Sequence, residues 1–139
     1  MRARQIPSDR RFTATHSWLA LAPGQNFSDF PLRAGVTDRA LDDIDVVGVD
    51  LPAVRSTVDA GSPCAVIWSS ARTAITVYAP IGGLITMTNR DATADPALVA
   101  EDPFHAGWLF AILPVPSSST YGLLTPAQYA TELNETVTL

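Results

Sequence analysis

The sequence has 139 residues, a length that gives one domain with a substantial core. Hydrophobic residues make up 47% and charged residues 17%, which excludes a disordered chain. The net charge is -5, and all nine basic residues are arginine, so no basic stripe is present to bind nucleic acid or an anionic membrane surface. The single cysteine excludes an internal disulfide and a cysteine-rich metal site.

The first residues are polar and rich in arginine, and Pro7 interrupts them. This composition predicts a flexible tail over residues 1–11, followed by one domain over 12–139. No apolar run follows the basic start, so the pattern indicates neither a signal peptide nor a membrane span. We therefore expect a cytoplasmic protein.

The first half of the domain predicts short elements separated by turns. Residues 12–21 alternate weakly around Trp18 and predict a strand, whereas residues 22–32 have the composition of a loop. Thr37 is a good N-cap for one helical turn at Asp38–Leu41. The apolar run 46–49 predicts a further strand, which ends before Leu51-Pro52.

The middle of the chain predicts three strands, at residues 64–68, 74–78 and 84–88. Their β-rich composition and the glycines and prolines between them favour a mainly β sandwich or barrel. The first two strands form a hairpin from Trp68 to Ala74, with residues 69–73 at its polar tip.

Two helices and one strand are predicted near the C-terminus. Asp95 is the expected N-cap of a short helix, with Pro96 in its first turn. Residues 107–113 predict a buried strand. Thr125 followed by Pro126 predicts the start of a terminal helix over 125–133.

Short motifs spread over residues 12–133 resemble the H protein of the glycine cleavage system. Each motif is weak, but together, in order and at nearly the family's spacing, they are strong. The motifs are Phe12-Thr13, His16-Ser17-Trp18-Leu19, Gly35-Val36-Thr37-Asp38, Leu51-Pro52, Thr57-Val58, Tyr78-Ala79-Pro80, Asn89, Pro96-Ala97-Leu98-Val99, Asp102-Pro103-Phe104 and Gly107-Trp108-Leu109.

The resemblance implies a lipoyl-domain-like fold, a barrel-sandwich hybrid of two antiparallel sheets with short helices and a C-terminal helix. It also implies a lysine at the hairpin tip that carries lipoate on a swinging arm. In that family, the arm collects an aminomethyl group at a pyridoxal-phosphate decarboxylase.

This sequence departs from the family at that tip. Counting back from Tyr78-Ala79-Pro80 places Arg72 at the lysine position, whereas counting forward from Gly61-Ser62-Pro63 places Ala71 there. The difference of one indicates a one-residue insertion at the tip, in the form of a bulge. A protonated guanidinium does not form the required amide, so the sequence predicts that no cofactor is attached.

The remaining candidate residues fall into two groups, each with a plain structural alternative. The tip residues are candidates for contact with a partner, although turn residues and solvated arginines are common: Trp68, Ser69, Ser70, Arg72 and Thr73. Three others are candidates to line the former lipoyl groove, although a buried cysteine and an isolated histidine are usually structural: His16, Trp18 and Cys64. No motif predicts a catalytic or metal-binding residue.

Three functions stay open. The first is an interaction or regulatory module without a lipoyl arm, which docks on a partner enzyme of pyridoxal-phosphate, one-carbon or glycine-cleavage type. The second is a small-molecule-binding protein or an enzyme that uses the former groove. The third, disfavoured by the missing lysine, is an aminomethyl carrier. We do not expect the protein to be an enzyme, although the second function leaves this open.

Overall fold

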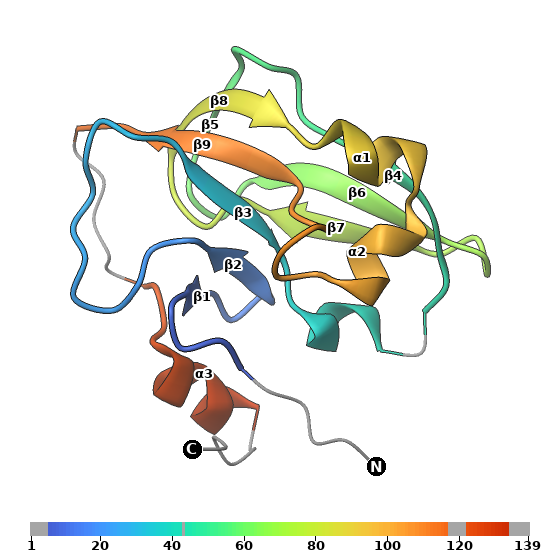
Figure 1. Ribbon diagram of the computed structural model, residues 1–139, viewed down its shortest axis with the longest axis horizontal. Helices are drawn as coiled ribbons and strands as arrows, with labels where there is room; N and C mark the ends of the chain where they lie inside the picture. Colours follow the sequence, from blue (N-terminus) through green and yellow to red (C-terminus); the bar gives the residue numbers. More distant parts are fainter. Residues whose placement is uncertain (1–5, 43, 117–121, 134–139) are drawn as a thin grey trace.

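The computed structural model describes residues 6–42, 44–116 and 122–133, and the chain in these ranges forms two β-sheets with short helices around them (Figure 1). The strands are β1 (Arg11–Phe12), β2 (Ser17–Leu19), β3 (Leu32–Val36), β4 (Val46–Asp50), β5 (Thr57–Val58), β6 (Pro63–Ser69), β7 (Ala74–Tyr78), β8 (Gly83–Thr88) and β9 (Phe110–Pro114). The helices are the 3₁₀ turn η1 (Asp38–Leu41), α1 (Arg90–Ala94), α2 (Ala97–Glu101) and α3 (Pro126–Glu132).

The larger sheet has the order β1-β2-β3-β9-β8-β5, and the smaller has the order β4-β6-β7. Every strand pair in both sheets is antiparallel. The predicted fold class is therefore confirmed: the chain is mainly β, with two antiparallel sheets, short helices and a C-terminal helix.

The main core lies between the two sheets. Ile85 and Ile112 from the larger sheet and Ile67 and Val77 from the smaller sheet are almost completely buried in one cluster. Side chains that alternate along each strand supply this inner face. Burial of apolar side chains from both sheets holds the layers together.

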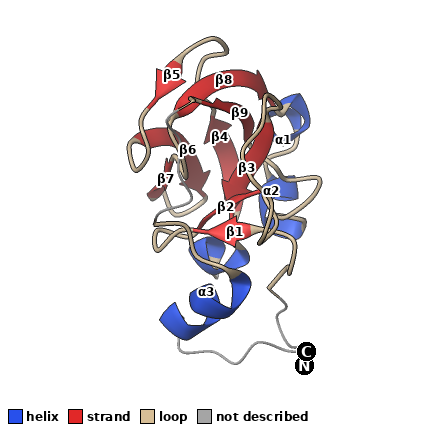
Figure 2. Ribbon diagram, turned by 90° about the vertical axis from the view of Figure 1, so that its left-hand side faces the viewer, coloured by secondary structure: helices blue, strands red, loops and turns tan. Residues whose placement is uncertain are grey.

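A second, smaller core joins α3 to the β1–β2 hairpin, and α3 lies below these strands in Figure 2. Phe12, Trp18 and Tyr129 are each at most 1% exposed, and the rings of Phe12 and Tyr129 stack at a centroid distance of 4.6 Å. Gly35 lies opposite Trp18 in the neighbouring strand, and a Cβ atom there would stand 2.9 Å from the indole nitrogen. The glycine therefore lets the indole lie across β3.

Local capping chemistry explains where the C-terminal helix begins. Thr125 accepts a hydrogen bond from the Gln128 backbone N–H, and the Gln128 side chain accepts one from the Thr125 backbone N–H. Pro126 occupies the first helical position, as predicted. The predicted N-cap Thr37 does precede η1, but its side chain makes no capping bond, because its hydroxyl lies 2.7 Å from that of Tyr129.

Three features of the C-terminal half differ from what the sequence predicted. Helix α1 was not predicted; it begins after Asn89, whose side chain accepts from the Asp91 backbone N–H. The predicted strand over 107–113 begins only at Phe110, because the preceding residues turn back on α2 and Gly107 N–H donates to Asp102 O. The short helix over 97–101 is present, with Pro96 and not Asp95 as its N-cap.

Residues 6–10, which belong to the predicted tail, pack on the smaller core through Ile6 and Arg10. Arg10 donates to Phe104 O at 2.9 Å, and its guanidinium carbon lies 5.0 Å from the Trp18 ring centroid. The division at residue 11 stays a prediction. Within the part of the chain that the structure describes, no helix has the length and apolarity needed to cross a membrane.

Candidate functional site: the hairpin tip

The tip of the β6–β7 hairpin is a tightly hydrogen-bonded turn. Ser69 N–H donates to Thr73 O at 2.9 Å, and Arg72 N–H donates to Ser69 O at 3.1 Å. The Ser69 hydroxyl oxygen accepts from the Thr73 backbone N–H at 3.1 Å. Arg72 has φ 64°, the left-handed conformation that closes such three-residue loops. The tip therefore has one well-defined backbone shape.

The β1–β2 hairpin is closed by the same turn. Thr13 takes the place of Ser69, with bonds from Thr13 N–H to Ser17 O and from His16 N–H to Thr13 O. The Thr13 hydroxyl oxygen likewise accepts from the Ser17 backbone N–H, and His16 has φ 67°. His16 thus occupies the position that Arg72 occupies at the other tip.

An extra residue was predicted at the tip, but the register shift that the structure shows in this hairpin lies at its base. Trp68 pairs with Ala74 as predicted, and the register is regular back to Ala65. It shifts between Pro63 and Ala65, so Cys64 is the additional residue on β6. A bulge there changes the residue count without changing the tip.

Trp68 is the prominent side chain beside the tip. It is 39% exposed, and its indole N–H donates to Asp50 Oδ2 at 2.8 Å. Across the neighbouring strands it pairs with Gly48 and Ala74, which are both small. The indole is therefore held by a hydrogen bond and stands on the outer face of the smaller sheet.

The other tip residues differ in what they present to solvent. Ser70, Ala71, Arg72 and Thr73 are exposed, whereas Ser69 is 6% exposed and uses its hydroxyl within the turn. Both candidates for the lysine position, Ala71 and Arg72, thus lie at the exposed tip. Ser70 N–H donates to Asp45 O, which ties the tip to the chain before β4.

A group of acidic residues occupies the sequence before β4 and the end of β4. Asp45 and Asp50 are exposed, and Asp38 pairs with Arg39 at 2.8 Å. Asp42 is also exposed, whereas Asp43, which belongs to the same acidic group in the sequence, lies outside the described residues. The tip therefore combines an aromatic ring, one cation at Arg72 and carboxylates beside them.

The three residues expected to line a groove take part in other contacts. His16 Nδ1 lies 2.7 Å from the Tyr129 hydroxyl, and Trp18 is 1% exposed and donates to Pro103 O at 3.0 Å. Cys64 packs against the main core, whereas Trp18 belongs to the smaller core. His105, the other histidine, lies 3.3 Å from Asp102, and no set of three metal-ligating side chains occurs among the described residues.

The sequence did not indicate Tyr129 as a residue that joins distant elements. Its hydroxyl lies 2.7 Å from both His16 Nδ1 and Thr37 Oγ1, and so links α3 to the tip of the β1–β2 hairpin and to the chain before η1. The available signal was an aromatic residue within the predicted terminal helix, which does not reveal its distant partners.

Burial raises the pKa of the Cys64 thiol from its ordinary value of 9.0 to about 11. At pH 8 the thiolate is then about a hundredfold rarer than in an exposed cysteine. We expect iodoacetamide to label the native protein at least about a hundredfold more slowly than an unstructured cysteine peptide. Labelling in urea is the control, and a native rate equal to that of the peptide would contradict the buried position.

Comparisons with known proteins agree with the geometry. A family model described as "Glycine cleavage H-protein" matches residues 10–136. The glycine cleavage system H protein of Legionella pneumophila (strain Corby) is 36% identical over 129 residues, which cover 92% of this chain and 98% of that protein. The H protein of Azoarcus sp. (strain BH72) is 39% identical over 129 residues, covering 92% and 96%.

A solved structure shares the fold. The crystal structure of a glycine cleavage system H protein from Mycobacterium marinum has a TM-score of 0.84 and 40% sequence identity. The match covers 93% of this chain and 99% of that chain. Sequence and structure therefore agree over nearly the whole length.

These matches correct the expectation that no cofactor is involved. Glycine cleavage H proteins normally carry a lipoyl group, so the family implies lipoate and the prediction of none was wrong. The tip residues themselves do not fit the usual lysine link, because the full sequence has no lysine and Arg72 and Ala71 stand at the tip. The family model, the relatives and the solved structure together lead to one conclusion: this chain belongs to the glycine cleavage H-protein family.

Proposed function

We propose that the chain is an H-protein-like interaction and regulatory module, which docks on a partner enzyme through the β6–β7 hairpin tip and the Trp68 face beside it. The partner is an enzyme of the glycine-cleavage or pyridoxal-phosphate one-carbon type. Docking does not depend on a lysine-linked lipoyl arm, since the chain has no lysine. A cytoplasmic location belongs to this proposal.

The observation that carries the proposal is the exposed indole of Trp68. Aromatic side chains that are fixed before binding lose little conformational entropy and are frequent anchors of protein interfaces. Here the bond to Asp50 fixes the ring, and the small neighbours Gly48 and Ala74 leave its surroundings open to a partner.

The rigid tip supports the same role. Its backbone bonds hold Ser70, Ala71 and Arg72 in one arrangement, so a partner meets a preformed surface. The exposed residues Asp45, Asp50 and Arg72 give that surface charges of both signs. Complementary charges on a partner would set the orientation and the rate of association.

The test is binding to the purified pyridoxal-phosphate decarboxylase and aminomethyltransferase of glycine cleavage from the same genome, measured by calorimetry. The intact mass of the chain is recorded first, so that any attached group is accounted for. We expect Trp68→Ala to weaken binding about thirtyfold, the effect of removing an interface anchor worth about 2 kcal/mol.

Phe30→Ala is the matched control. Phe30 is another exposed aromatic residue, 73% exposed, in the loop between β2 and β3, which lies at the opposite end of the molecule from the hairpin tip in Figure 1. Its removal should leave the affinity unchanged. Equal affinities for the wild type and Trp68→Ala, or no binding to either enzyme, would contradict the proposal.

A further inference from the structure

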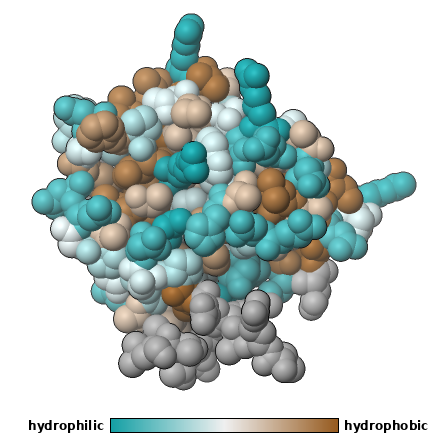
Figure 3. Space-filling model, in the orientation of Figure 1, coloured by the Kyte–Doolittle hydropathy of each residue, from teal (hydrophilic) through white to brown (hydrophobic). Residues whose placement is uncertain are grey.

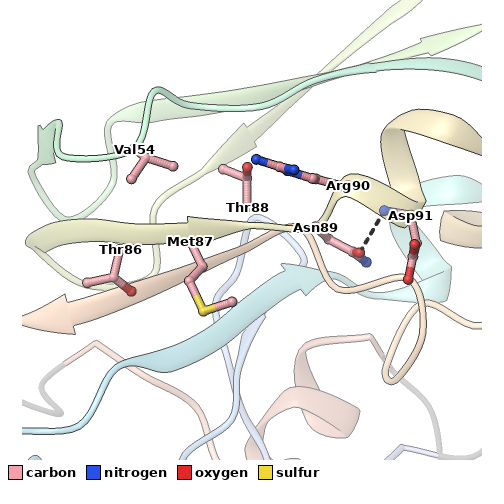
Figure 4. Close-up of a pocket in the computed structure, with 7 residues that line it drawn as sticks. All are labelled: Val54, Thr86, Met87, Thr88, Asn89, Arg90 and Asp91. Carbon is pink, nitrogen blue, oxygen red and sulfur yellow. Dashed lines mark hydrogen bonds between the residues drawn. The ribbon is translucent and has the colours of Figure 1, made fainter.

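A surface hollow of about 430 Å³ lies next to the N-terminal end of the short strand β5, and none of the hairpin-tip residues lines it. It is bounded by Val54 from the loop before β5, by the last residues of β8 and by the start of α1 (Figure 4). In the space-filling view, hydrophobic residues lie in small patches among hydrophilic ones, and the described residues form no large apolar surface on this face (Figure 3).

Strand β8 has an open edge along this hollow. Its pairing with β5 covers Gly83 and Leu84, and two further bonds join Ile85 to Arg55 and Ser56. Among the described residues, no further backbone bond joins Thr86–Thr88 to the loop 51–56. The β5 side of the sheet thus ends three residues before β8 does.

The backbone of Thr88 faces that open side. Asn89 N–H donates to Leu109 O, and Thr88 is the next residue in the β8–β9 ladder, opposite Phe110. Hydrogen-bonded and non-hydrogen-bonded pairs alternate in an antiparallel ladder, so the Thr88 N–H and C=O point away from β9. An added strand could bond to them, which is how extended peptides bind to sheet edges.

The side chains that line the hollow lie on two sides of this edge. The register of β8 shifts between Ile85 and Met87, and Thr86 and Met87 point to the same side in Figure 4. Val54, Thr88 and Arg90 lie on the other side, where Arg90 extends over Thr88 toward Val54. Met87 is 53% exposed and Val54 is 49% exposed, so each side offers an apolar surface.

The charge of the Val54 side is positive. Arg90 is exposed and, among the described residues that line the hollow, is the one charged residue on that side, because Asp91 points away from it in Figure 4. A strand added to the edge directs alternate side chains to the two sides. An acidic side chain would therefore meet Arg90 while its apolar neighbours meet Met87.

We propose that the open edge of β8 binds an extended peptide segment of a partner protein, in which apolar residues alternate with polar ones that include an acidic residue facing Arg90. This site is separate from the hairpin tip. The bound peptide would pair with β8 as an added strand, in line with β5, and would make its apolar contacts with Met87 and Val54.

The probe is a blocked hexapeptide, acetyl-Val-Thr-Val-Glu-Val-Thr-amide, titrated into the ¹⁵N-labelled full chain. We expect saturable chemical-shift changes at residues 86–88 and slower hydrogen exchange of the Thr88 amide. Arg90→Glu should weaken binding at least about tenfold, as should lysine in place of the glutamate in the peptide. Combining both changes should restore binding, which isolates the charge pair.

Arg72→Glu is the control, because it reverses an exposed arginine at the hairpin tip and should leave peptide binding unchanged. The proposal is wrong if neither peptide gives saturable shifts, if the shifts occur at residues 70–73, or if Arg90→Glu binds as well as the wild type. Equal shifts from N-acetylvaline without slower exchange at Thr88 would assign the hollow to small molecules instead. None of these results depends on the docking measured with Trp68→Ala.

Discussion

Replacing Gly83 with alanine is expected to lower the free energy of unfolding by about 3 kcal/mol. Gly83 pairs with Val58 on one side and with Pro114 on the other, and a Cβ atom there would overlap the backbone oxygen of Leu113. A backbone oxygen held in a sheet cannot rotate away as a flexible side chain can, so β9 would have to move from β8. Urea unfolding followed by tryptophan fluorescence gives the difference.

The adjacent glycine provides a matched control. A Cβ atom at Gly82 would meet its nearest atom, Val58 O, at 3.5 Å, which is ordinary van der Waals contact. Gly82→Ala should therefore change the unfolding free energy by no more than about 0.5 kcal/mol. Equal losses for the two variants would contradict the close approach of β8 and β9 at Gly83.

Trp18→Ala is expected to cost about 4 kcal/mol of unfolding free energy. The indole is 1% exposed and is the largest side chain of the smaller core, and its loss leaves a cavity and an unpaired Pro103 carbonyl. The guanidinium of Arg10 loses its aromatic neighbour as well. Chemical unfolding followed by circular dichroism is the measurement, because it does not depend on the deleted fluorophore.

Trp68→Ala removes the same side chain from an exposed site and should cost no more than about 1 kcal/mol. The two tryptophan variants should therefore separate stability from docking. Trp18→Ala lowers stability, whereas Trp68→Ala lowers the affinity for the partner enzyme. Loss of both properties in Trp68→Ala would show that its indole is part of the core, against the structure.

Local chemistry allowed parts of the fold to be predicted from the sequence. Thr125, Pro126 and Gln128 form the start of a helix with groups that lie within four residues of one another, so the prediction needed no knowledge of the fold. The hairpin from Trp68 to Ala74 was predicted for the same reason, from two β-rich runs around a polar tip.

Features that depend on distant contacts were not predicted. The apolar run at Gly107 and Trp108 was read as a strand, although a Cβ atom at Gly107 would stand 2.7 Å from Leu98 O of α2. Helix α1 has one buried residue, Ala92, and its start depends on Asn89, whose amide also donates to Ala106 O and Trp108 O. The neighbours of Trp68 depend on the register between β4 and β6, which includes a shift between Val46 and Gly48.

The repeated turn at the two hairpins has a consequence for how the tip can change during evolution. At each tip the turn is closed by backbone groups and by the hydroxyl of Ser69 or Thr13, with a further bond between the Thr13 and Thr15 hydroxyls at the first tip, and none of these bonds is made by the side chain of the fourth residue. At the first tip that fourth residue, His16, is tied to Tyr129, whereas at the second it is the exposed Arg72. Residues that tolerate the left-handed conformation of Arg72 can therefore replace it with little effect on folding, so selection among them acts on what the tip contacts, while the hydroxyl of Ser69 is constrained by the turn.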